Sequence, residues 1–152
     1  MKIFKKVSLL CAILLVTVVA SAQGQTLGSR VSAHIPFDFS IGDKKLPSGK
    51  YSVGRARLNA DDVVISIEDH GGRSKALRTS IPVITRDATS KGKLVFHRYG
   101  DQYFLYQVWP AGGTTGRQLP KSRSEREIQE NLAANRAVGQ TVETVTITDV
   151  LQ

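Results

Sequence analysis

Apolar and polar residues alternate without a fault from Val31 to Ile41, and this alternation limits the fold more than any other feature of the sequence. Every odd position of the segment VSAHIPFDFSI is apolar, whereas the even positions carry polar residues or Pro36. A period of two places successive side chains on opposite faces of a β-strand. The segment therefore predicts an amphipathic strand with its odd positions in a core. Because proline cannot donate to a sheet ladder, we expect an edge or a kink at Pro36.

Further short segments of strand character follow, separated by turn-forming residues. They cover residues 50–55, 63–67, 93–99, 102–109 and 141–150, with turns at 42–49 and 59–62. Short strands at this spacing predict a mainly antiparallel β-barrel or β-sandwich of about seven or eight strands.

The turn from His70 to Arg73 leaves two registers open for the strand that follows it. A two-residue Gly-Gly loop would put Ala76 and Arg78 opposite Ile67 and Ile65. A loop of three or five residues would instead bring the odd positions 77, 79 and 81 to the apolar side, because one residue of slip exchanges the two faces. We favour the odd loop.

The segment from Lys93 to Trp109 predicts a hairpin with Gly100-Asp101 as a two-residue loop. Glycine at the first central position fits a type II′ turn. In that register Tyr99 faces Gln102, His97 faces Phe104 and Val95 faces Tyr106, while Arg98 faces Tyr103 and Phe96 faces Leu105. Since both faces carry aromatic residues, we expect a central hairpin that is covered on both sides.

The period changes to that of a helix near the C-terminus. Ser124 with Glu127 matches a capping box, and Ile128 and Leu132 lie four residues apart on one face. We therefore expect one amphipathic helix from about residue 125 to 137, ending before Gly139. Its narrow apolar face places it on the surface of the β-structure.

Residues 1–22 have the pattern of a signal peptide. Three lysines precede an apolar stretch of 14 residues, Val7 to Ala20, and Ala20-Ser21-Ala22 matches a signal-peptidase site. The apolar stretch is shorter than the roughly 20 residues that cross a bilayer. We expect cleavage after Ala22, a single exported β-rich domain at 23–152 without a membrane span, and a periplasmic or extracellular location.

Removal of residues 1–22 would change the charge and the cysteine content. The net charge would fall from +8 to +5, and the only cysteine, Cys11, would be lost. Such a chain has no disulfide, so its stability must come from a packed core. Nucleic acid is not expected as a partner of an exported protein, although a weakly basic chain suits an anionic envelope surface.

The sequence offers no recognisable catalytic constellation. The histidines His34, His70 and His97 lie in separate segments, and none has metal-ligand spacing. Glu68-Asp69-His70 beside a Gly-Gly turn is better explained as a hairpin tip than as a metal site. The mature chain has no G-x-S-x-G elbow and no thiol nucleophile. We expect no catalytic residues, no metal and no cofactor.

The aromatic residues of the 93–109 hairpin are the candidates for ligand binding. Tyr99, Tyr103, Tyr106 and Trp109, together with His97, would form a stacking platform for a sugar or a small apolar ligand. The alternative is that these rings form the core.

Three classes of function follow. The leading hypothesis is an exported non-enzymatic β-domain that binds a small ligand or a cell-envelope partner. The first alternative is a structural or assembly module of the envelope, because the Pro36 strand and the C-terminal strand are candidates for edge pairing. The second is a small hydrolase, which would need His70 or His97 near both a carboxylate and a hydroxyl in a cleft.

Three segments also resemble the recurring blocks of a family of small exported proteins of acidobacterial type, whose function is unassigned. They are residues 35–53 (IPFDFSIGDKKLPSGKYSV), 93–109 (KLVFHRYGDQYFLYQVW) and 116–128 (GRQLPKSRSEREI). The resemblance implies export and a β-rich fold, and it brings no activity, cofactor or site residue.

Overall fold

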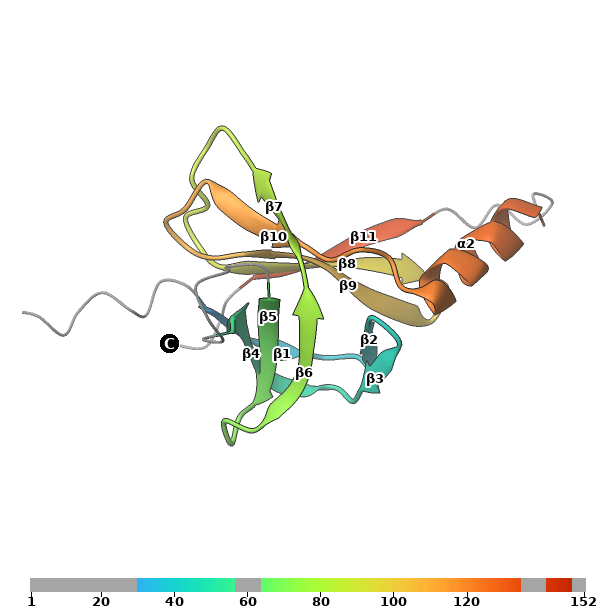
Figure 1. The fold of residues 1–152 in the computed structure, drawn as a ribbon, viewed down its shortest axis with the longest axis horizontal. Helices are drawn as coiled ribbons and strands as arrows, with labels where there is room; N and C mark the ends of the chain where they lie inside the picture. The colour runs from blue at the N-terminus through green and yellow to red at the C-terminus, as the bar shows by residue number, and fades with distance from the viewer. Residues whose placement is uncertain (1–29, 57–63, 135–141, 149–152) are drawn as a thin grey trace, which may run out of the picture.

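A computed structural model describes residues 30–56, 64–134 and 142–148 of the chain as two β-sheets with a helix at one end (Figure 1). The sheets are not closed into a barrel, so of the two predicted architectures the structure is consistent with the sandwich. The expected signal peptide, residues 1–22, lies outside the described residues, as do the turn at 59–62 and the expected end of the helix.

The first sheet has the strand order β1-β4-β5-β6 and is antiparallel throughout. Its strands are β1 (Arg30–Ile35), β4 (Gly49–Arg55), β5 (Val64–Asp69) and β6 (Ser74–Thr79).

The second sheet has the order β11-β8-β9-β10-β7. Its strands are β7 (Ile81–Ile84), β8 (Lys93–Tyr99), β9 (Gln102–Trp109), β10 (Thr115–Gln118) and β11 (Glu143–Thr148). The short hairpin of β2 (Phe39–Ile41) and β3 (Lys44–Leu46) joins this sheet through a parallel bridge from Ser40 to Phe104.

The described residues form eleven strands instead of the predicted seven or eight. The long alternating segment breaks at Pro36 into β1 and β2, and β3 lies inside the predicted turn 42–49. The predicted kink at Pro36 is confirmed, and β1 is an edge strand of its sheet. Because β2 has left the first sheet, it can cross to the second and pair with β9.

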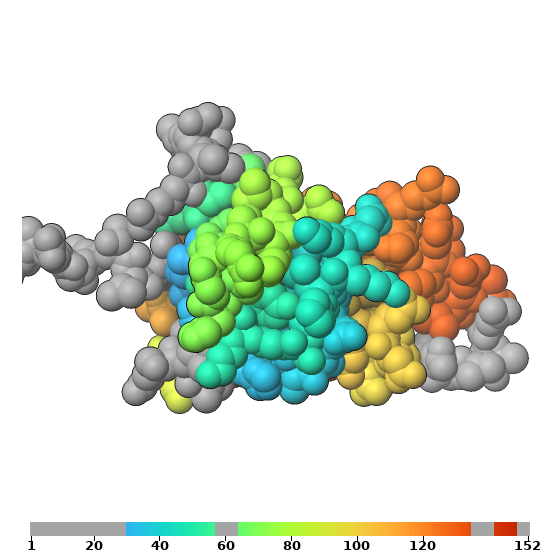
Figure 2. Space-filling view, turned by 90° about the horizontal axis from the view of Figure 1, so that it is seen from below, coloured from blue at the N-terminus to red at the C-terminus, as the bar shows by residue number. Residues whose placement is uncertain are grey.

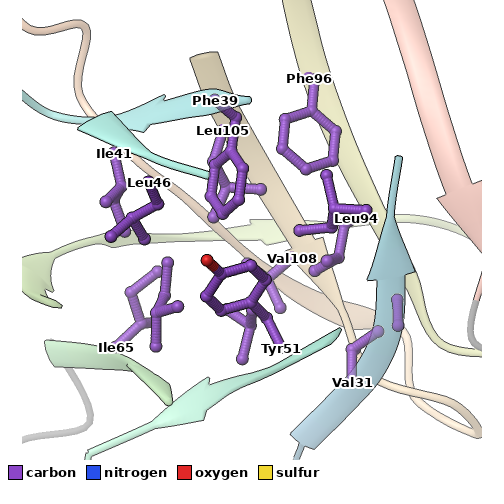
Figure 3. Close-up of a cluster of buried hydrophobic side chains, with 14 of the residues drawn as sticks. Val31, Phe39, Ile41, Leu46, Tyr51, Ile65, Leu94, Phe96, Leu105 and Val108 are labelled. Atoms are coloured by element: carbon purple, nitrogen blue, oxygen red, sulfur yellow. The ribbon is translucent and has the colours of Figure 1, made fainter. Parts of the chain in front are cut away.

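The core is a single apolar layer between the two sheets (Figure 3). The alternation is confirmed, since Val31, Ala33, Ile35 and Ile41 are fully buried and Phe39 is 2% exposed, while Phe37 is partly buried against this core. The other members come from both sheets: Leu46, Tyr51, Val53, Ile65, Ile67, Leu94, Phe96, Leu105, Val108 and Leu119. Burial of each large apolar side chain contributes about 1.5–3 kcal/mol.

The register after the turn at His70 is that of the two-residue alternative, so the favoured apolar placement of residues 77, 79 and 81 is wrong. The loop itself has three residues, because the Asp69 N–H donates to the Arg73 carbonyl at 3.0 Å. A bulge then leaves Lys75 without a cross-strand partner and shifts the pairing of β6 by one residue. After the bulge, the even positions of β6 lie on the core side and the odd positions on the outer side. Arg78 lies opposite Ile65, while Leu77 and Ile81 are 44% and 50% exposed.

The β8–β9 hairpin has the predicted pairing over its first four pairs, from Tyr99 and Gln102 to Phe96 and Leu105. Gly100 has a φ of 59°, as its position in the turn requires. Val95 pairs with Gln107 and not with Tyr106, because a bulge adds one residue to β9 at this point. The prediction for Val95 is therefore wrong.

The helix, α2 (Arg123–Ala134), begins two residues earlier than expected. Its cap is Ser122, whose Oγ accepts a hydrogen bond from the Glu125 N–H at 3.1 Å, so the predicted cap at Ser124 is wrong. The S-x-x-E pattern occurs twice here with an offset of two residues, and only the first copy is used. The helix stands out at one end of the molecule beside the tip of the β8–β9 hairpin (Figure 2).

One tight contact between strands gives a test of the packing. A Cβ added to the buried Gly116 would lie 2.5 Å from Cδ2 of the Trp109 ring. We expect Gly116→Ala to lower the free energy of unfolding by about 1–3 kcal/mol, because the ring must shift. Urea denaturation measures this change. Gly113→Ala is the control, since its nearest heavy atom would be 3.9 Å away. Equal stability of the two variants would contradict the described contact.

Candidate binding sites

The structure divides the predicted aromatic platform among three places. Tyr103 lies on the side of the hairpin that faces the first sheet, where its ring stacks on Phe37 with centroids 3.8 Å apart. His97, Tyr99 and Tyr106 lie together on the opposite side. Trp109 is at the far end of the hairpin, over Gly116. The five residues therefore do not form one continuous surface.

A buried carboxylate holds the helix against the hairpin. One oxygen of Glu125, Oε1, lies 2.7 Å from His97 Nδ1 and accepts a hydrogen bond from the Tyr99 hydroxyl at 3.1 Å. Glu125 is only 5% exposed, and the His97 ring stacks on Tyr106 at 3.9 Å. Burial, followed by the nearby Glu125 carboxylate, raises the pKa of Tyr99 well above its usual value. This network fastens the first turn of α2 to β8.

The same network meets one of the two conditions for the hydrolase hypothesis. His97 lies within hydrogen-bond distance of a carboxylate. However, the Tyr99 hydroxyl donates to Glu125 and not to His97, and His97 lines none of the three pockets described for residues 30–56, 64–134 and 142–148. The second condition is therefore not met at His97. His34 is exposed, and His70, which is also exposed, lines a pocket with Glu68, Asp69 and the hydroxyl-bearing Ser32 and Ser52.

The Glu68-Asp69-His70 cluster lines a pocket of about 440 Å³ on the outer side of the first sheet. Its carboxylates have partners, because Glu68 pairs with Arg30 at 3.0 Å and Asp69 pairs with Lys75 at 2.9 Å. The hydrogen bond from Lys75, together with that from the Arg73 N–H, lowers the pKa of Asp69 to about 2. Among the described residues, no group of three or more His, Cys, Asp and Glu side chains is placed to hold a metal ion.

One pocket that includes a residue of the predicted platform lies between the β2–β3 hairpin and the tip of the β8–β9 hairpin. Its volume is about 310 Å³, and Tyr103 is the one predicted site residue that lines it. Charged and polar groups surround it, while nearly buried apolar side chains form its base. The other lining residues are Asp38, Phe39, Ser40, Lys45, Leu46, Pro47, Asp101 and Gln102.

The linear sequence does not bring the two sides of this pocket together. Asp38 and Lys45 lie about 60 residues before Asp101, and the packing of β2 beside β9, with the bridge between Ser40 and Phe104, brings them together. Glu125 was likewise missed as a buried group. Its signal was the Ser122-Arg-Ser-Glu125 capping pattern, which places Glu125 at the third helical position, close to the body of the protein.

The Glu125 network predicts that substitutions of Glu125 and Glu127, two glutamates of one helix, differ in their effect on the free energy of unfolding. Glu125→Gln removes the charge that the buried Tyr99 and the partly buried His97 share, so we expect a loss of about 1–3 kcal/mol in the free energy of unfolding. The pKa of Tyr99 should fall toward its usual value, because the adjacent negative charge is gone. Urea denaturation and ultraviolet titration of tyrosine measure the two effects.

The control is Glu127→Gln, which alters an exposed pair with Arg123. Exposed pairs contribute about 0–1 kcal/mol, so this variant should stay close to the wild type. Equal losses in the two variants would contradict a special role for the buried carboxylate.

Comparison with known proteins found no relative of this chain. The sequence matches no protein-family model and no curated protein, and the structure matches no solved structure. Among the described residues, no helix is long and apolar enough to cross a membrane.

Proposed function

We propose that the mature chain is an exported, non-enzymatic β-sandwich that binds a small polar ligand in the pocket between the β2–β3 hairpin and the tip of β8–β9. The observation that carries the proposal is the lining of this pocket. It joins carboxylates at Asp38 and Asp101 with donors at Lys45 and Gln102, over an apolar base. A few polar groups around an apolar surface are typical of small-molecule sites.

The ligand class follows from the mixture of donors and acceptors. Sugar hydroxyls donate and accept at once, so they suit a site with both carboxylates and amino or amide groups. Part of the Tyr103 ring is already covered by Phe37, and the Arg98 guanidinium carbon lies 5.5 Å from the ring centroid. Recognition therefore depends on hydrogen bonds more than on stacking. A volume of about 310 Å³ suits a mono- or disaccharide.

A panel of neutral and amino mono- and disaccharides tests the proposal on the chain that begins at Gln23. We expect a saturable change in the NMR signals of the lining residues for at least one sugar. Lys45→Ala should weaken that binding about fivefold, the equivalent of one hydrogen bond. Calorimetry or NMR titration measures the change. Lys91→Ala is the control, because Lys91 is another exposed lysine that does not line the pocket. If no sugar binds, or if both variants lose affinity equally, the proposal is wrong.

A second candidate function is assembly through the edge formed by β6 and β7. Leu77, Ile81 and Ile84 are large apolar side chains that are 44%, 50% and 80% exposed, and all three lie on this one segment. β6 ends the first sheet and β7 ends the second. Exposed apolar edge strands are sites at which another chain can add a strand. An envelope protein that pairs with this edge fits these observations.

Charge introduced at the edge tests the second candidate. Ile81→Lys combined with Ile84→Lys should abolish a cross-link between the protein and an envelope component without unfolding the domain. Val142→Lys is the control, because Val142 is 42% exposed on a different part of the chain. Cross-linking in the envelope fraction, with light scattering for self-association, measures the outcome. A wild-type protein that is monomeric and recovers no cross-linked partner would contradict the assembly function.

A further inference from the structure

The strand β6 directs backbone groups away from its own sheet. In an antiparallel ladder, successive residues of a strand turn their N–H and C=O groups to opposite sides. Val64 accepts a hydrogen bond from the Ala56 N–H at 2.8 Å, so it turns toward the side of β4. The next residue, Ile65, therefore turns toward its partner Arg78 in β6. Leu77, which precedes Arg78, turns its N–H and C=O to the other side, and β6 is the last strand in the order of this sheet.

The strand β7, which ends the second sheet, carries a proline on its open side. The Thr85 N–H donates to the Thr114 carbonyl at 2.9 Å, on the side of β10. By the same alternation, Ile84 and Pro82 turn away from β10. Proline has no N–H, so an added strand would lose a ladder hydrogen bond at this point. Of the two exposed strands, β6 is therefore the one to which another strand can pair.

Two cations at the open side of β6 hydrogen-bond to backbone carbonyls. Arg78 Nε donates to the Ile41 carbonyl at 3.3 Å, and Lys44 Nζ donates to the Lys75 carbonyl. Lys75 itself pairs with Asp69, with the ammonium and carboxylate 2.9 Å apart. Within residues 30–56, 64–134 and 142–148, neither Lys44 nor Arg78 pairs with a carboxylate. Their positive charges are therefore available to a partner.

The side chains around β6 differ between its two faces. Arg78 lies opposite the fully buried Ile65 and so on the core side, and Lys44 reaches β6 from the β2–β3 hairpin, which belongs to the second sheet. Leu77 lies on the outer side and is 44% exposed. Figure 2 shows β6, in light green, at the surface next to the β2–β3 hairpin. An added strand would thus meet cations on one face and an apolar side chain on the other.

We propose that β6 pairs with an extended segment of another protein in which acidic residues alternate with apolar residues. The inference rests on the second candidate function, assembly at this edge, and specifies the chemistry of the partner. Because the side chains of a strand alternate between faces, such a segment places its carboxylates toward Lys44 and Arg78 and its apolar side chains toward Leu77. Backbone hydrogen bonds to Leu77 supply affinity, and the alternating side chains supply specificity.

A second copy of this chain fits the edge less well than an acidic partner. Pairing of β6 with itself would bring two copies of Lys44 and Arg78 to one edge, and opposed like charges destabilise a strand pair. The formal net charge of the sequence is +8, and it remains positive, at +5, without residues 1–22. Charge complementarity therefore assigns the edge to an acidic partner.

The experiment titrates the chain that begins at Gln23 with short peptides and follows binding by calorimetry and NMR. The first peptide alternates glutamate with valine, the second alternates lysine with valine, and the third is the glutamate peptide with methylated backbone amides. We expect saturable binding of the glutamate peptide and slower hydrogen exchange at the Leu77 amide. The other two should bind about tenfold more weakly or less, because one repels the cations and the other lacks backbone donors.

The outcomes separate this inference from the assembly function itself. Equal binding of the lysine peptide would overturn the acidic chemistry, and equal binding of the methylated peptide would overturn strand pairing. Failure of the glutamate peptide to bind overturns the whole inference. In each case, a cross-linked envelope partner that is lost when Ile81→Lys and Ile84→Lys are combined would still support assembly at this edge, whereas its absence would overturn both.

Variants test the two cations. Lys44→Gln and Arg78→Gln should each weaken the glutamate peptide about threefold to fivefold, and the two together about tenfold, because each removes one exposed ion pair. Lys44→Arg should retain the affinity. Lys50→Gln is the matched control, since Lys50 is an exposed lysine of β4, away from this edge. An equal loss in the control would show nonspecific attraction and overturn the proposal. If Arg78→Gln fails to fold, the two Lys44 variants still give the result.

Discussion

The apolar layer between the two sheets holds every other part of the structure in place. The sequence contains a single cysteine, so no disulfide within the chain can join the sheets, and close packing of the inward side chains takes that role. Each sheet alone would expose one apolar face to water. The pocket beside Tyr103 and a second pocket, lined by Arg55 and Arg117, both lie at margins of this layer, where side chains from the two hairpins or the two sheets no longer meet.

The polar groups at these margins follow a common pattern. Arg55 and Arg117, each opposite a buried core residue, occupy core-facing positions only where the layer ends. Glu125 is buried outside the layer, on the far side of β8, and there its carboxylate has two hydrogen-bond partners. A buried carboxylate without such partners would cost several kcal/mol, so the helix and the hairpin depend on each other at this point.

The sequence was sufficient for the fold class, the first strand, the break at Pro36 and the first pairs of the β8–β9 hairpin. These features follow from a period of two and from turn chemistry, which are properties of neighbouring residues. It was not sufficient wherever a single extra residue exchanges the two faces of a strand. The bulges at Lys75 and Tyr106 have no distinctive composition. The first reversed the expected placement of Leu77, and the second changed the cross-strand partner of Val95. The two sides of each pocket come from distant segments, so spacing along the chain could not reveal them.

The passage of the chain from β6 to β7 has a consequence for how the molecule opens. The two strands are separated only by Ser80, which is 1% exposed, and they form the edges of different sheets (Figure 1). Because one buried residue and no loop connects β6 to β7, a displacement of one sheet should also move the edge strand of the other. Amide hydrogens of β5 and of β10, which lie next to this edge in the two sheets, should then become accessible to solvent exchange in the same opening event, so that the sandwich loosens as one cooperative unit.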